Sequence, residues 1–268
     1  MTKYAIVTTF HAKGYEQYAQ KFIQTFIDTW PKDIMLYAYA ENCKVHESAT
    51  NLTVLDLHRE SPELVAFKQQ WGNVPKANGD VSKDPIRSKR RDAGKGFKWD
   101  AVRFSHKVYA IFDCARKTDA DVLIWMDADM ICHSPITLAT IDSFIPKDKD
   151  ICFLGREGKF SECGLYSMNL TSKMTKQFLK RFQEVYDDAE NGIFKYDEWH
   201  DSFVFDEVRH TVQLNELNWT NGLIKGEGHP LINSQWGAYL DHLKGKRKEY
   251  GKSLKNDLIV SRQEEYWK

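Results

Sequence analysis

The chain has 268 residues, enough for one large α/β domain, and 42% of them are hydrophobic, which excludes disorder over most of the length. Its 38 basic and 38 acidic residues cancel, so the overall charge gives no reason to expect a polyanionic partner. The five cysteines are scattered and form no CxxC pair, which excludes a zinc ribbon or a disulfide framework; we expect buried free thiols.

The first quarter of the chain predicts a nucleotide-binding arrangement. Residues 4–10 form a short apolar run rich in β-branched side chains, which favours a buried parallel strand. Residues 15–30 carry apolar side chains at helical spacing, and Pro31 ends the pattern. Residues 34–40 and 52–57 predict two further strands. A β-α-β-β order of this kind is typical of the nucleotide-binding half of an α/β domain.

The middle of the chain predicts a long loop, a helix and a strand. Residues 72–96 mix Gly and Pro with Asn and Lys, so we expect a loop there. We predict that its part 83–96, which is strongly basic, closes as a lid over a bound ligand. A helix over 99–117 and a buried strand over 122–126 follow, and the strand runs directly into Asp127-Ala128-Asp129.

Further elements are predicted beyond this point. Residues 151–154 and 164–168 resemble strands, and 174–188 is an amphipathic helix. The segment 203–208 fits a helix and a strand equally. The tail from residue 244 is rich in lysine, so we expect it to be exposed.

The chain shows no internal repeat and no low-complexity linker, so we predict one domain. Its parts are a nucleotide-binding half (1–130), a half for donor sugar and acceptor (131–250) and a C-terminal tail (251–268). The apolar run near the N-terminus is too brief for a signal peptide, and no stretch approaches the ~20 apolar residues that span a bilayer. We therefore expect a cytoplasmic protein without a membrane span.

The strongest chemical signal is the pair Asp127 and Asp129 directly after an apolar strand. In an extended segment residues i and i+2 point the same way, so the two carboxylates converge at the carboxyl end of a parallel strand. Open α/β sheets place their ligands at that edge. Two close carboxylates repel unless a cation lies between them, and Mn²⁺ or Mg²⁺ suits such oxygen ligands. The pattern therefore predicts a divalent metal that binds a diphosphate.

The segment 122–130, VLIWMDADM, resembles the DxD strand of GT-A fold glycosyltransferases. The resemblance implies a Rossmann-like α/β fold with a mixed, mostly parallel central sheet flanked by helices. It also implies that Asp127 and Asp129 bind Mn²⁺ or Mg²⁺ and, through the metal, the diphosphate of a sugar nucleotide, most commonly a UDP-sugar. By the same resemblance Thr8 and Thr9 lie where the first strand meets the nucleotide, and Arg103 lies near the donor sugar or phosphate.

A second segment, HLKGKRK at 242–248, fits the pattern HxxGxxK. It resembles the C-terminal motif of family 8 retaining transferases, without the Pro-Trp that follows there. The resemblance makes His242 a third metal ligand and places Gly245 and Lys248 at the diphosphate. An imidazole ligates Mn²⁺ and an ammonium group binds phosphate oxygens, so the chemistry agrees. His229, in a Gly-rich loop, is the alternative ligand.

A third segment, WHDS at 199–202, resembles the Trp-His-Asp-Glu segment of family 6 retaining transferases. His200 and Asp201 match, but Ser202 replaces the glutamate near the anomeric carbon, which leaves the stereochemical course open. Asp201 is the candidate for a donor-sugar contact or an acceptor base, with a helix cap as the plainer alternative. Glu162 either binds the acceptor or is a solvated turn residue, and Gly164 permits close approach of substrate.

These signals together predict a hexosyl- or pentosyltransferase that acts on a saccharide, a lipid-linked glycan, a protein or a modified (hydroxymethylated) DNA base. Two alternatives remain. A nucleotidyltransferase also combines such a fold with metal-binding carboxylates, although the Gly-rich basic loop expected after its first strand is missing at 8–14. A non-catalytic nucleic-acid-binding protein would use the basic segment 83–98, which has seven basic and two acidic residues and two aromatic neighbours.

Overall fold

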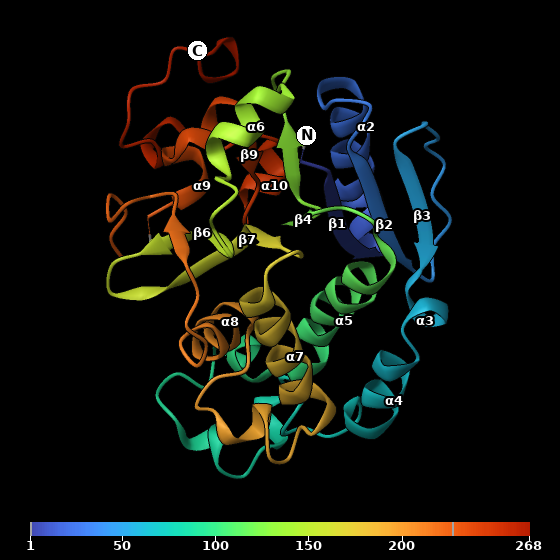
Figure 1. Ribbon diagram of the computed structural model, residues 1–268. Helices are drawn as coiled ribbons and strands as arrows, with labels where there is room; N and C mark the ends of the chain where they lie inside the picture. Colours follow the sequence, from blue (N-terminus) through green and yellow to red (C-terminus); the bar gives the residue numbers. More distant parts are fainter. Residues whose placement is uncertain (1, 227) are drawn as a thin grey trace.

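The computed structural model describes residues 2–226 and 228–268, and this part of the chain forms a mixed α/β domain around a seven-stranded sheet (Figure 1). The strand order is β3-β2-β1-β4-β7-β6-β8, and only β7 runs against the others. A separate two-stranded sheet pairs β5 with β9. The strands are β1 (Tyr4–His11), β2 (Met35–Glu41), β3 (Leu52–Asp56), β4 (Val122–Met126), β5 (Met130–Cys132), β6 (Ile151–Arg156), β7 (Lys159–Asn169), β8 (Glu216–Asn218) and β9 (Leu240–His242).

Helices cover both faces of the central sheet. Helices α5, α7 and α8 lie on one face, and α2, α6 and α9 lie on the other (Figure 1). The helices are α1 (Ala12–Gly14), α2 (Gln20–Thr29), α3 (Leu57–Glu60), α4 (Pro62–Trp71), α5 (Ala101–Lys117), α6 (Leu138–Phe144), α7 (Lys173–Asp187), α8 (Asp201–Arg209), α9 (Pro230–Asn233) and α10 (Arg247–Tyr250). A π-helical segment, Tyr15–Ala19, joins α1 to α2. These layers confirm the predicted fold class.

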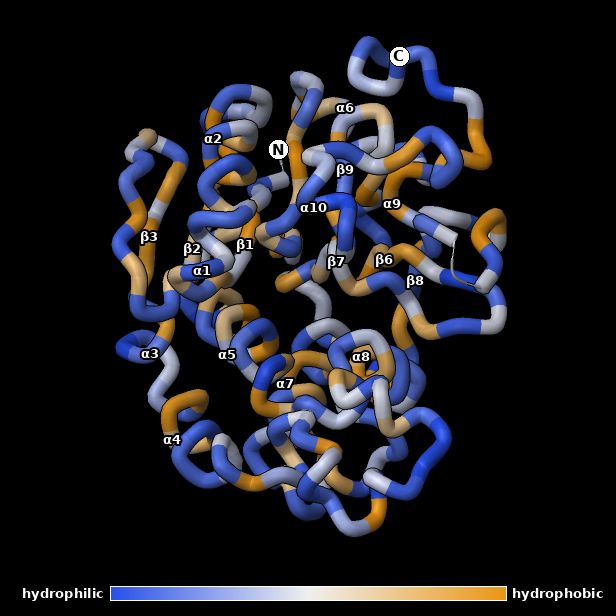
Figure 2. The backbone as a smooth tube through the Cα atoms, turned by 180° about the vertical axis from the view of Figure 1, so that it is seen from behind, coloured by the Kyte–Doolittle hydropathy of each residue, from blue (hydrophilic) through white to orange (hydrophobic). Residues whose placement is uncertain are grey.

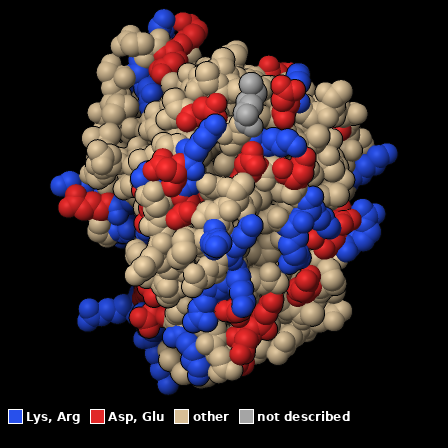
Figure 3. Space-filling model, viewed as in Figure 1, with Lys and Arg blue, Asp and Glu red and all other residues tan. Residues whose placement is uncertain are grey.

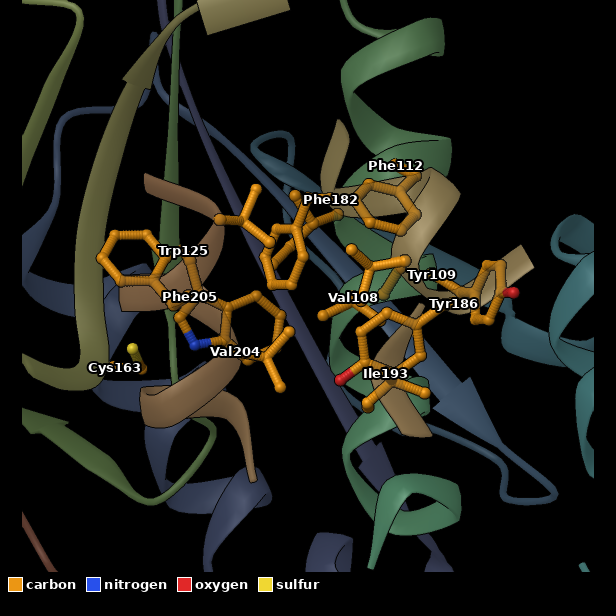
Figure 4. Packing of buried hydrophobic residues seen from close by; sticks show 14 of the residues in the cluster. Val108, Tyr109, Phe112, Trp125, Cys163, Phe182, Tyr186, Ile193, Val204 and Phe205 are labelled. Carbon is orange, nitrogen blue, oxygen red and sulfur yellow. The ribbon is translucent and has the colours of Figure 1, made fainter. Parts of the chain in front are cut away.

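Alternation along the strands divides the interior into two cores. In β4, Leu123 and Trp125 face the α5 side, whereas Ile124 and Met126 face the α2 side, as the two-residue period of a strand requires. The tube in Figure 2 shows hydrophobic residues along the inner strands and on parts of the helices that pack against them. On the α5 side, aromatic rings from α7 and α8 fill the space against β4, with Phe182 and Phe205 among them (Figure 4).

Most predicted elements are confirmed, and segment 203–208 lies in helix α8. The predicted loop 72–96 contains only short 3₁₀ turns, so it is confirmed as irregular. Helical structure begins at Ala12 and not at residue 15 as predicted, because the His11 side chain accepts a hydrogen bond from the backbone N–H of Gly14 and caps the helix. The pattern did not reveal α3 and α4, or the three-residue strands β5 and β9, which are too short to show a period.

The C-terminal tail from residue 244 is largely exposed or partly exposed, as predicted, but it is anchored near its end. Trp267 is buried, and its ring nitrogen donates to the Gly237 carbonyl at 2.7 Å. Tyr266 stacks on His133 with ring centroids 4.0 Å apart, and its hydroxyl donates to Asp241. Burial of Trp267, together with the stacking of partly buried Tyr266, fixes the end of the tail against the α2 side of the molecule.

Four cysteines are buried, as expected, and Cys43 is partly exposed. All five are free thiols. Within 2–226 and 228–268, no helix is long and apolar enough to pass through a bilayer.

Candidate functional site

The two aspartates form the floor of the site at the carboxyl end of β4. The backbone N–H of Asp127 donates to the Gly164 carbonyl at 2.8 Å, which ties the turn after β4 to the neighbouring strand β7. The carbonyl of Asp129 accepts from the backbone N–H of Leu243 at 3.0 Å. The turn is therefore held from both sides, and both carboxylates face the cleft described below.

The small sheet brings His242 to the aspartates. Met130 pairs with His242 in the β5–β9 ladder, so the histidine lies directly beside the turn. Its Nε2 lies 3.0 Å from Asp129 Oδ1 and 3.5 Å from Asp127 Oδ2. One atom from each of the three residues lies within 4.8 Å of the others, close enough for a single ion to contact all three.

His242 itself fits a metal ligand. Both ring nitrogens are buried without a hydrogen-bond partner, although carboxylate oxygens lie close, because those contacts lack hydrogen-bond alignment. A buried polar atom without a partner is costly, and a metal ion would satisfy it. On the other side of the ring, Glu162 Oε1 lies 3.2 Å from Nδ1, the position of a carboxylate that orients a ligating histidine. The donor set of two carboxylates and one imidazole therefore fits a divalent transition-metal ion such as Mn²⁺.

The charges of this cluster are strongly coupled. Burial raises the pKa of Asp129, but the cationic side chains of His242 and Lys248 outweigh it and hold that pKa well below its usual range. Burial lowers the pKa of His242, but Asp129 and Glu162 outweigh it and raise it to about 9. Asp129 and His242 therefore stabilise each other's charged forms.

Cationic side chains surround the floor of the site. Lys248 Nζ is 2.8 Å from Asp129 Oδ2, and Lys244 Nζ forms a close ion pair with buried Glu162. Arg103 lines the same cleft from the first turn of α5. Gly245 has a φ of +57° and open space around it, so the turn between the two lysines places no side chain in the cleft.

Lys107 joins the two acidic walls of the site. Its Nζ lies 3.1 Å from Asp127 Oδ1 and 2.9 Å from Asp201 Oδ2, and it also donates to the Cys163 carbonyl. The ammonium group lies 4.7 Å from the Trp125 ring centroid, on a side chain that is only 8% exposed. Burial raises the pKa of Asp201, but Lys107 outweighs it and lowers it, so Asp201 is ionised. One buried cation thereby fixes both carboxylates.

The cleft above this floor has a volume of about 1100 Å³. A smaller hollow of about 450 Å³ adjoins it and shares Asp127, Asp129 and Arg103. Thr9 and Tyr18 line the smaller hollow, whereas Thr8 is fully buried and lines neither. Of the two threonines expected at the nucleotide, the structure therefore brings only Thr9 to the site.

The remaining predicted residues take more specific places. His200 caps helix α8, lines the larger cleft and lies 2.9 Å from Glu198. Asp201 is the first residue of α8 and also lines this cleft. Glu162 is 2% exposed within β7, so the prediction of a solvated turn residue is wrong.

His229, the alternative metal ligand, lies behind the cluster. Its Nε2 is 3.0 Å from the His242 carbonyl, not near the aspartates. Burial lowers the pKa of His229 to about 4, so its ring is neutral. The structure therefore brings His242, and not His229, to Asp127 and Asp129.

Sequence reasoning did not identify Lys107, Trp125 or Lys244 as site residues. Lys107 is four residues after Arg103, on the same helical face, which was an available signal. Trp125 lies within the predicted strand 122–126, yet its ring nitrogen donates to Asp127 Oδ1 at 2.7 Å. Lys244 lies inside the HxxGxxK segment, at a position the motif leaves unspecified.

The basic loop reaches the site at one end only. Lys95, Phe97 and Lys98 line the larger cleft. Arg87, further back, forms a 2.6 Å ion pair with Asp84 and lies 4.2 Å from the ring of buried Trp199. Closure of 83–96 as a lid stays a prediction.

Gly164 offers a direct test of the geometry around His242. A Cβ at this position would lie 2.4 Å from His242 Cε1 and 2.6 Å from its Nδ1, so the imidazole must move. We expect Gly164→Ala to weaken Mn²⁺ binding by about tenfold or more, because disturbing the residues that orient a metal ligand typically lowers metal affinity about 10- to 100-fold. Calorimetric titration measures the change. Gly94→Ala is the matched control, since a Cβ there meets nothing within 4 Å; equal affinities in both variants would contradict the geometry.

No family model matches the chain, and no curated protein does. Among solved structures, mouse xyloside xylosyltransferase 1 shares 15% identity over 78% of this chain and 82% of its own, with a TM-score of 0.42. GlyE, a glycosyltransferase of Streptococcus pneumoniae, shares 11% over 81% of this chain, with a TM-score of 0.45. The bifunctional glycosyltransferase WbbM shares 8% over 82%, with a TM-score of 0.47. The match spans 46% of GlyE and 39% of WbbM.

Proposed function

We propose that this protein is a metal-dependent glycosyltransferase that uses a nucleotide-diphosphate sugar, with UDP-sugar as the first donor to test. One observation carries the proposal: Asp127, Asp129 and a buried His242 without a hydrogen-bond partner converge at the floor of a large cleft. A hard divalent cation would be held by this set, with free coordination positions open to the cleft.

Different residues around the floor are placed to contact different parts of the donor. The metal, when bound, would offset the negative charge that develops on the leaving nucleoside diphosphate. Lys248 and Arg103 are placed to contact the phosphate oxygens. Thr9 and Tyr18, in the adjoining hollow, are placed toward the nucleoside. The larger cleft is then left for the donor sugar and the acceptor.

Asp201 and His200 face the larger cleft from the start of α8. Asp201 is ionised beside Lys107, so it accepts hydrogen bonds from sugar hydroxyls or takes a proton from the acceptor. Glu162, which is buried against His242 and Lys244, acts on the metal ligand and not on the acceptor. We therefore assign Glu162 a positioning role.

Calorimetric titration of UDP with and without Mn²⁺, repeated on Asp127→Ala, tests the proposal. We expect binding that requires both the metal and Asp127. Release of UDP from a panel of UDP-sugars would then identify the donor sugar. If no nucleoside diphosphate, GDP included, binds in the presence of Mn²⁺ or Mg²⁺, the proposal fails.

The alternatives predict different measurements. A nucleotidyltransferase would release pyrophosphate from a nucleoside triphosphate and a sugar phosphate. The structure favours it less, because β1 leads directly into the helix at Ala12 and not into a phosphate-binding loop. A nucleic-acid-binding protein would retard the migration of DNA in a gel at low salt. The same measurement tests whether a modified DNA base is the acceptor. On the face seen in Figure 3, however, basic and acidic side chains are interspersed.

His242 and His229 are distinguished by paired variants. We expect His242→Ala to weaken Mn²⁺ binding about 100-fold, because it removes a ligand. His229→Ala should leave Mn²⁺ affinity within about tenfold, because its Nε2 contacts the His242 carbonyl and the Ser253 hydroxyl rather than the aspartates. Titration of Mn²⁺ into both variants measures the difference. A loss confined to His229→Ala would assign the ligand to His229.

A further inference from the structure

A second group of metal-ligating side chains lies at the carboxyl end of β2, outside the set at the DxD turn. Glu41 ends β2, His58 lies in α3 and His106 lies in α5, and one atom from each lies within 4.8 Å of the others. Glu41 Oε1 is 3.2 Å from Nε2 of each histidine. Ligand atoms around a tetrahedral zinc ion with bonds of about 2.0 Å are about 3.3 Å apart, so the present spacing already suits zinc.

The fourth corner of this arrangement holds an ammonium group. Lys68 Nζ, from α4, is 3.2 Å from His58 Nε2 and 3.0 Å from His106 Nε2, and it forms a close ion pair with Glu41. Three acceptors therefore surround one cation of the protein itself. The Lys68 side chain is 28% exposed, so it has a route to solvent.

Hydrogen bonding fixes His106 in the tautomer that a metal needs. Its Nδ1 lies 3.0 Å from the Arg103 carbonyl, and a carbonyl can only accept, so Nδ1 carries the proton. The Nε2 lone pair is then left to accept a hydrogen bond from the Lys68 ammonium group, 3.0 Å away. A backbone carbonyl that holds the far nitrogen is the usual support of a zinc-ligating histidine.

We propose that Glu41, His58 and His106 form a zinc site, distinct from the Mn²⁺ site, in which Zn²⁺ displaces the Lys68 ammonium group. Two imidazoles and one carboxylate favour zinc over Mg²⁺ or Ca²⁺, which prefer oxygen ligands alone. Zinc and an ammonium group repel at this range, so Lys68 withdraws to solvent and water takes the fourth position. The proposal does not depend on the glycosyltransferase assignment.

The site has a direct connection to the donor hollow. Glu41 and His106 line that hollow together with Thr9 and Asp127. His106 shares helix α5 with Arg103 and Lys107. Zinc would therefore join β2, α3 and α5 at the edge where the nucleotide is expected, and would withdraw Lys68 from that edge.

Zinc calorimetry on the Asp129→Asn protein tests the proposal, because this background disables the first site. We expect one equivalent of Zn²⁺, and a four-coordinate Co²⁺ absorption spectrum on substitution. Adding His58→Gln and His106→Gln should abolish both signals. His46→Gln, which removes an imidazole outside both clusters, should keep them. Retained stoichiometry in the double histidine variant would overturn the proposal.

Lys68→Met supplies the second test. Because the ammonium group competes with zinc, its removal should tighten Zn²⁺ binding by about tenfold or more. Zinc should also raise the melting temperature of this variant, a readout that needs no substrate. Unchanged or weaker zinc affinity in a folded Lys68→Met protein would overturn the proposal, as would an absence of zinc binding in both backgrounds.

Discussion

Replacing Asp129 by Asn is expected to abolish Mn²⁺-dependent binding of UDP, a loss of more than about 100-fold. Asp129 Oδ1 lies 3.0 Å from His242 and Oδ2 lies 2.8 Å from Lys248, so this carboxylate contacts both the proposed third ligand and the lysine proposed to bind phosphate. Substituting a residue that only orients a metal ligand lowers metal affinity about 10- to 100-fold, and removing a charged ligand lowers it further. The substitution conserves shape and removes charge, so the fold should persist.

Calorimetry with UDP and Mn²⁺ measures this loss, and circular dichroism checks the fold. Asp119→Asn is the matched control, because that carboxylate is 85% exposed and pairs with Lys3, far from the aspartates of the DxD turn. It should bind like the original protein. If Asp129→Asn binds UDP with undiminished dependence on Mn²⁺, the metal site lies elsewhere.

The second large effect is expected at Lys107. Lys107→Met keeps the length of the side chain but leaves Asp127 and Asp201 without their shared cation. Breaking a buried ion pair costs about 3 kcal/mol, so we expect a loss of stability of that order. Because Asp201 then loses the interaction that keeps it ionised, sugar transfer should fall by at least about 100-fold even where the protein stays folded.

Urea unfolding and a UDP-release assay separate the two consequences. Lys180→Met is the control for stability, since Lys180 is 78% exposed on α7 and its ion pair with Glu184 spans 3.8 Å. Exposed pairs contribute less than about 1 kcal/mol. Equal stabilities for the two variants would show that Lys107 does not hold the two aspartates together.

The layers of the fold and the two aspartates at the floor of the site could be predicted from the sequence, for physical reasons. Strand β4 is a run of five buried residues, and a strand buried on both faces needs such a run. The two aspartates follow it directly, so their position at the sheet edge could be inferred. His242 was found through a motif, although its proximity to Asp129 depends on the β5–β9 pairing, which left no periodic signal.

What could not be predicted depends on contacts between distant segments. Lys107 lies within an otherwise helical pattern, and only the fold shows that it meets Asp201 from another helix. Thr8 and Thr9 are adjacent in sequence, yet strand alternation buries one and exposes the other to the cleft. The tail has the composition of a solvated segment, and only the fold shows that Trp267 anchors its end in the core.

The β5–β9 ladder also fixes the order in which the site becomes complete during synthesis. Asp129 leaves the ribosome more than one hundred residues before His242, a delay of roughly ten seconds at ordinary elongation rates. In that interval the nascent chain holds both aspartates but lacks the imidazole, Lys244 and Lys248. A chain that stops early therefore carries the two aspartates without the rest of the proposed metal site, which is completed only when β9 pairs with β5.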